Sequence, residues 1–165
     1  MLPIFLSSCA ELRPSPVSLS DRIYTFLNAH NTLSLATVAD DGTPHACALF
    51  YAVAPDLTLY FLSDPNTLHG RHLESRPRVA ATVEANNQDW KDIRGIQLRG
   101  RAGRCPATDL HRARALYAAR FPFVARAETL AGPLQRACYY RLVPDWIRLI
   151  DNTLGFGHKE EWHRP

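Results

Sequence analysis

The stretch TLSLATVADDGTPHACALFYAV, residues 32–53, decides the fold of this chain. Residues 32–38 are apolar and rich in β-formers, and residues 45–53 repeat that character. Between them, the segment DDGT at residues 40–43 is typical of a hairpin turn, in which Gly42 supplies a positive φ angle. The stretch therefore predicts two antiparallel strands joined by a tight turn.

Short elements continue on both sides of this hairpin. We expect helices over residues 21–30, about 67–76 and 109–121, and further strands over residues 57–62, 79–83, 95–103, 137–143 and 146–150. Thr108 is expected to cap the third helix, and Pro144-Asp145 to turn the chain between the last two strands. Six or seven short strands with three small helices predict a mainly β fold, a closed or nearly closed antiparallel barrel.

Length and composition favour a single globular domain. The 165 residues are 46% hydrophobic and 21% charged, which excludes a disordered chain, a collagen-like repeat and a coiled coil. We expect residues 1–18 to be a flexible N-terminal tail and residues 19–165 to be the domain. No apolar run approaches the roughly 18 residues of a membrane span, so no membrane partner is expected.

Charge and cysteine content limit the classes of partner, the cellular location and the kinds of site to be expected. The net charge of +3 is too small to indicate nucleic acid, and Arg99, Arg101 and Arg104 fit a solvated strand face better than an RNA-binding patch. The four cysteines are scattered without metal-like or disulfide-like spacing, which favours a reducing, cytoplasmic location. His69 and His72 are three residues apart with no third ligand near in sequence, so the sequence predicts no metal site.

The strongest chemical signal lies at the start of the second helix. Thr67 is a hydroxyl group at a helix N-terminus, where free N–H groups and the helix dipole favour an anion. His69 follows two residues later, and Arg71 lies in the same helix. This segment therefore predicts a phosphate-binding site.

The order of elements, with the hairpin motif D-G-x-P-H and the helix start T-x-H, resembles the FMN-binding split β-barrel of the pyridoxamine 5′-phosphate oxidase-like superfamily. Residues 32–103 carry this resemblance. The ending IDNTLGFGHK, residues 150–159, is similar to the uncharacterised YhbP-like branch and extends the match to about residues 20–162. The resemblance implies that two subunits hold FMN between them.

The same resemblance assigns the cofactor-binding residues. Along the isoalloxazine ring and ribityl chain it places Cys47, Ala48, Leu49, Phe50 and Tyr51, and at the phosphate it places Thr67, Leu68 and His69. Phe156, between two glycines, or Trp162 is expected to cover a ring, and the alternative is a glycine-rich turn that anchors the final strand. The oxidase has arginine and lysine where this chain has Leu68 and His69, and the arginine–histidine pair that grips its substrate is missing here. Vitamin B6 oxidation is therefore not predicted.

These residues predict a homodimeric FMN-binding protein, a flavin-dependent oxidoreductase of unknown substrate with no assignable catalytic residue. A homodimer is also expected because residues 45–53 are apolar on both faces, and one barrel interior buries only one of them. Two alternatives remain open. One is a non-catalytic flavin or heme binder, with His45, His69 or His158 as the heme ligand. The other is an RNA- or partner-binding module.

Overall fold

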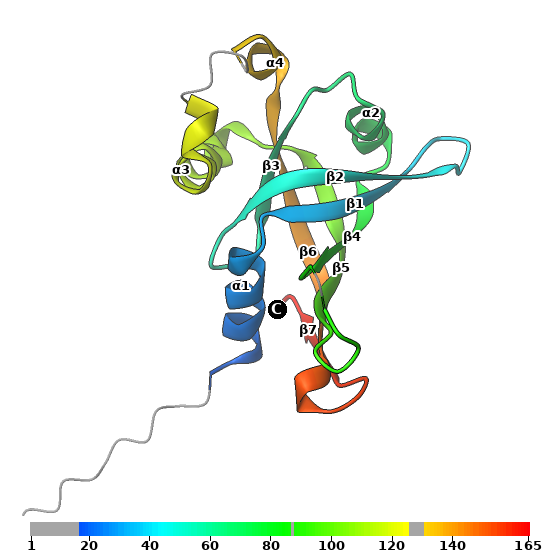
Figure 1. The fold of residues 1–165 in the computed structure, drawn as a ribbon. Helices are drawn as coiled ribbons and strands as arrows, with labels where there is room; N and C mark the ends of the chain where they lie inside the picture. The colour runs from blue at the N-terminus through cyan, green and yellow to red at the C-terminus, as the bar shows by residue number, and fades with distance from the viewer. Residues whose placement is uncertain (1–16, 87, 126–130) are drawn as a thin grey trace, which may run out of the picture.

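The barrel is built from six antiparallel strands and carries a seventh strand at its side (Figure 1). The computed structural model describes residues 17–86, 88–125 and 131–165; all but the last two residues of the predicted tail lie outside them. The strands are β1 (Thr32–Val38), β2 (Pro44–Val53), β3 (Leu59–Ser63), β4 (Arg78–Glu84), β5 (Arg94–Arg104), β6 (Cys138–Asp151) and β7 (Lys159–His163). They are ordered β3-β2-β1-β4-β5-β6-β7, and pairing of β3 with β6 closes the barrel. The predicted mainly β, antiparallel split-barrel class is confirmed.

The described residues include four α-helices outside the barrel: α1 (Leu19–Ala29), α2 (Leu68–Ser75), α3 (Leu110–Arg120) and α4 (Ala131–Arg136). Ser18 caps α1 by accepting a hydrogen bond from the amide of Asp21, and Ile23 and Leu27 on one face of this helix are fully buried. In Figure 1, α2 lies beside the hairpin end of β1 and β2, while α3 lies at the opposite end of β2. None of the helices in the described residues has the length and apolar character needed to span a bilayer.

Strict alternation along the strands separates the core from an outer face. In β1, buried Leu33, Leu35 and Thr37 alternate with exposed residues, and the same pattern runs through β4 and β5. The inward side chains form one core with the apolar face of α1. This alternation is what the sequence of β5 predicted, with Ile96 and Leu98 inside.

Two local predictions were wrong. Residues 138–151 form one continuous strand, because Asp145 is accommodated as an extra residue opposite the step between Arg99 and Gly100 instead of making a turn. Gly100 pairs with Pro144 at this irregularity. Thr108 lies within a short 3₁₀ turn, and α3 begins at Leu110 without a side-chain cap.

The barrel is split between β2 and β3. β2 pairs with β1 along most of its length, but it pairs with β3 only at Tyr51, Ala52 and Val53. The amide of Tyr51 donates to Asn31 on the β1 side, so the peptide groups of alternate residues point the other way. The N–H and C=O groups that Ala46 and Ala48 direct to this side lie beyond the pairing with β3 and have no backbone partner among the described residues.

Candidate functional site

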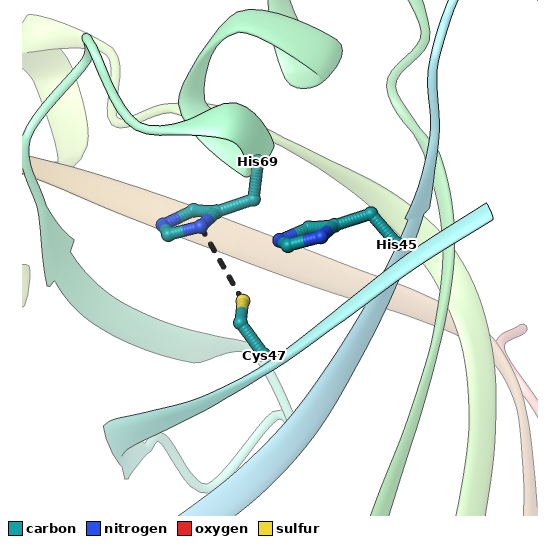
Figure 2. A group of neighbouring side chains, drawn as sticks. All are labelled: His45, Cys47 and His69. Atoms are coloured by element: carbon teal, nitrogen blue, oxygen red, sulfur yellow. Dashed lines mark hydrogen bonds between the residues drawn. The ribbon is translucent and has the colours of Figure 1, made fainter. Parts of the chain in front are cut away.

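Three side chains meet where α2 packs against β2. His45 and Cys47 are two residues apart and so lie on the same face of the strand, and His69 reaches them from the first turn of α2 (Figure 2). One nitrogen or sulfur atom of each side chain lies within 4.8 Å of the others. His69 is only 7% exposed, whereas His45 and Cys47 are half-buried. The cluster therefore has a buried end and a more open end.

Both ring nitrogens of His69 are engaged by short-range partners. Its Nε2 lies 2.5 Å from Ser63 Oγ and 3.1 Å from Thr67 Oγ1, and its Nδ1 lies 3.4 Å from Cys47 Sγ. Ser63 is itself buried at the end of β3. The imidazole of His69 is thus fixed in orientation between β3 and β2.

Burial shifts the pKa values of His69 and Cys47 toward their uncharged forms. Burial, together with the nearby His45 and His72, lowers the pKa of His69. Burial also raises the pKa of the Cys47 thiol. The lowered pKa favours a neutral imidazole at His69, where the oxidase has a lysine.

Thr67 is the N-cap of α2. Its hydroxyl accepts from the amide of Gly70 at 3.1 Å and donates to the carbonyl of Asp64 at 2.8 Å. The first turn of a helix leaves further amides free, and here these include those of Leu68 and His69. Any anion at this terminus would therefore meet backbone N–H groups before it met the side chain of His69.

The other predicted cofactor-binding residues have different surroundings. Ala48 and Phe50 point outward from β2, and Phe50 is 47% exposed beside Phe121. Leu49 packs against the core, and Tyr51 is fully buried, with its hydroxyl donating to the carbonyl of Leu27. Tyr51 could thus contact a ligand only through its backbone.

Two further predicted residues are exposed, at opposite ends of the molecule. Leu68 is 50% exposed at the start of α2. Phe156 is 83% exposed beside Trp90, in the turn between β6 and β7, at the far end of the molecule from α2 (Figure 1). The structure therefore groups the residues of β2 and α2 but not Phe156, and their flavin-binding roles stay predictions.

Sequence reasoning missed the pairing of His45 with Cys47. The two residues stand at the i and i+2 spacing that puts side chains on one strand face, which was a readable signal. The sequence did single out His69 and His72 as a pair on one helix. These two side chains do not share a partner, because Nδ1 of His72 faces Thr37 Oγ1 at 3.0 Å. What no local pattern shows is that α2 folds back onto this part of β2.

A six-stranded split barrel with a half-open polar cluster beside its second strand defines the class of the protein. The chain belongs to the pyridoxamine 5′-phosphate oxidase family, whose model matches residues 19–146. Within it, a UPF0306 protein of Klebsiella pneumoniae is 37% identical over 116 residues, covering 70% of this chain and 74% of that protein. The UPF0306 protein YhbP of Salmonella newport is 34% identical over 119 residues, with coverages of 72% and 76%. The predicted YhbP-like branch is confirmed.

Solved structures share the fold at lower identity. A heme binding protein from Mycobacterium smegmatis matches with a TM-score of 0.72 and 20% identity, over 92% of this chain and 59% of the other, so this chain spans about three fifths of that protein. A conserved hypothetical protein from Mycobacterium tuberculosis matches with a TM-score of 0.69 and 25% identity, with coverages of 88% and 93%. A FAD-binding protein from Mesorhizobium loti matches with a TM-score of 0.59 and 22% identity, with coverages of 74% and 87%.

Proposed function

We propose that the protein is a homodimeric FMN-binding protein that acts as a flavin-dependent oxidoreductase. The observation that carries the proposal is the unpaired side of β2, which leads toward the N-terminus of α2. The peptide groups of Ala46 and Ala48 offer donors and acceptors in a row. A flavin ring edge carries carbonyl oxygens and ring nitrogens that such a row could bind, and a phosphate suits the helix terminus.

The hydrogen-bond donors at the start of α2 fit the phosphate of FMN, and no buried charged side chain is needed. The backbone amides of Leu68 and His69 would face the phosphate, and the exposed Arg71 in the same helix would add a positive charge. Bound flavin would supply hydride chemistry at its N5 atom, while this chain would supply position and surroundings. No catalytic acid or base is assigned. His69 is engaged by Ser63, and His72 by Thr37.

A second subunit has a suitable place to bind. The outer sheet face, as we call it, presents small exposed or half-buried side chains across three neighbouring strands: Ser34, Ala36, Ala46, Ala48, Ala80 and Thr82. Small residues make this face flat, and exposed Phe50 borders it. A second copy of the chain could cover it by two-fold symmetry.

The proposal is tested by FMN titration with a variant of the unpaired β2 side. Ala48→Pro removes one N–H group that points away from β1, so it costs no sheet hydrogen bond. We expect the purified wild-type protein to be yellow, or to bind added FMN, and Ala48→Pro to bind at least about tenfold more weakly, as expected for a lost hydrogen bond. Ala48→Ser is the control at the same position. A wild-type protein that binds no FMN would refute the proposal, and unchanged binding by Ala48→Pro would refute the role of this strand side.

Heme binding is the second candidate, and His45 favours it. This imidazole is half-buried at the open end of the cluster, and no hydrogen bond holds it among the described residues. By contrast, His158 is bonded to Glu160 at 3.1 Å. A Soret band that is lost in His45→Ala, with no flavin bands, would replace the flavin proposal by this one.

A further inference from the structure

We propose that His45, Cys47 and His69 bind a divalent transition-metal ion of the zinc type, leaving its fourth coordination position open. The metal site uses the side chains of residues whose backbone lies beside the proposed flavin site, and it does not depend on flavin binding. The three ligand atoms belong to the residue types that zinc prefers, and they already lie within 4.8 Å of one another. Their two supporting elements are fixed, since β2 is a barrel strand and α2 packs on it.

The distance between the ligand atoms of Cys47 and His69 is close to the value that coordination of one ion requires. In a tetrahedral zinc site, a thiolate sulfur at about 2.3 Å and an imidazole nitrogen at about 2.05 Å from the ion are roughly 3.6 Å apart. Cys47 Sγ and His69 Nδ1 are 3.4 Å apart. A bound ion would therefore need little movement of these two side chains.

The hydrogen bonds of His69 on the side away from Cys47 have the pattern of a metal-binding histidine. A metal-binding histidine usually hydrogen-bonds through its other ring nitrogen, which fixes the ring and selects the coordinating atom. Here Nε2 is held by Ser63 and Thr67, so Nδ1 remains for the ion, on the side of Cys47.

His45 completes the ligand set from the open side. Its ring is nearly parallel to that of His69, at an interplanar angle of 6° and a centroid separation of 6.4 Å (Figure 2). Two imidazoles bound to one tetrahedral ion would have centroids about 5 Å apart, so the half-buried His45 ring would have to move inward by roughly 1 Å. When the ion binds, the thiol proton of Cys47 leaves to the buffer and the sulfur binds as thiolate.

The experiment adds Co²⁺ or Zn²⁺ alone to untagged, metal-free and flavin-free protein. We expect one ion per chain, with intense visible cobalt bands of tetrahedral coordination and a near-ultraviolet thiolate-to-cobalt band. Cys47→Ser should abolish the thiolate band, and His45→Ala should weaken zinc binding by at least about 100-fold. Ser63→Ala, which removes only an outer contact, should weaken it by about 10- to 100-fold.

Two residues outside the ligand group provide controls. Cys105→Ser removes another partly buried thiol. His72→Asn removes a histidine whose Nδ1 faces Thr37 Oγ1 and whose ring meets that of His45 edge-on at a centroid separation of 5.8 Å. Both variants should keep the cobalt spectrum. A wild-type protein without the thiolate band, or a band that survives in Cys47→Ser, would overturn the metal site and leave the flavin proposal untouched.

Discussion

Gly100 shows how a single residue shapes the barrel. A Cβ atom at this position would lie 2.3 Å from the carbonyl oxygen of Val143 and 2.7 Å from the Cα atom of Pro144, both of which are backbone atoms. Glycine therefore lets β5 pass the irregular part of β6, where the Pro144-Asp145 pair enters the sheet. Gly100 is one of several inward positions of β5, and the continuity of β6 depends on it.

We expect Gly100→Ala to lower the free energy of unfolding by about 2–3 kcal/mol, because backbone atoms of β6 cannot move aside cheaply. Gly103→Ala in the same strand is the control, since its Cβ would meet no atom within 4 Å. That control should change the stability by less than about 0.5 kcal/mol. Urea unfolding of the three proteins measures the difference, and equal stabilities would show that the close contact relaxes.

At the scale of elements, α3 is tied to the turn between β2 and β3 by an ion pair. Arg112 donates two hydrogen bonds to the carboxylate of Asp56, at 3.0 and 3.1 Å, and the amide of Thr58 donates a third at 3.2 Å. Burial acts to raise the pKa of Asp56, but the hydrogen bonds from Arg112 and Thr58 outweigh it, so the pKa lies below its ordinary value of 3.8. The ionised carboxylate is therefore the form that the fold stabilises.

This pair predicts a pH-dependent contribution to stability. Because the pKa is lower in the folded chain, the contribution is complete well above pH 3.8 and is lost as the pH falls through the folded-state pKa. Asp56→Asn should cost about 0.5–1 kcal/mol near neutral pH, a small value because both side chains are partly exposed, and nothing in strong acid. A double-mutant cycle with Arg112→Gln isolates the pair. A coupling energy that persists in strong acid would contradict the assignment.

At the scale of the whole molecule, a substitution at Phe50 tests the proposed contact between subunits. It is exposed at the border of the outer sheet face, whereas its neighbour Leu49 packs against the core, so Phe50 is the residue to change. Phe50→Asp should convert a dimer into monomers and lose FMN at the same time, because a charge would be buried between the subunits. Sedimentation and FMN titration measure the two effects together.

The control for Phe50 is Leu154→Asp. Leu154 is 58% exposed but lies in the turn after β6, away from the outer sheet face. This variant should stay dimeric and keep its flavin. A wild-type protein that is monomeric at micromolar concentration and still holds FMN would remove the dimer from the proposal.

The sequence by itself determined most of the local structure. The apolar, β-forming composition of residues 32–38 placed β1 to its exact ends, and alternation placed β5 to within one residue. Gly42 marked the hairpin with its positive φ angle, and Thr67 marked the start of α2. These features depend on neighbours along the chain, so period, turn chemistry and capping reveal them. Together they also predicted the barrel, and the order of elements with its motifs supplied the resemblance to the family.

Only the tertiary structure decided the rest, because it depends on residues distant in sequence. Whether Pro144-Asp145 turns the chain depends on the partner strand, where Gly100 leaves room for an extra residue. Whether His69 faces a ligand or the interior depends on Ser63 and Cys47, which reach it from two strands of the split barrel. A local sequence pattern gives no information on these side-chain contacts, because they form only when α2 packs on β2.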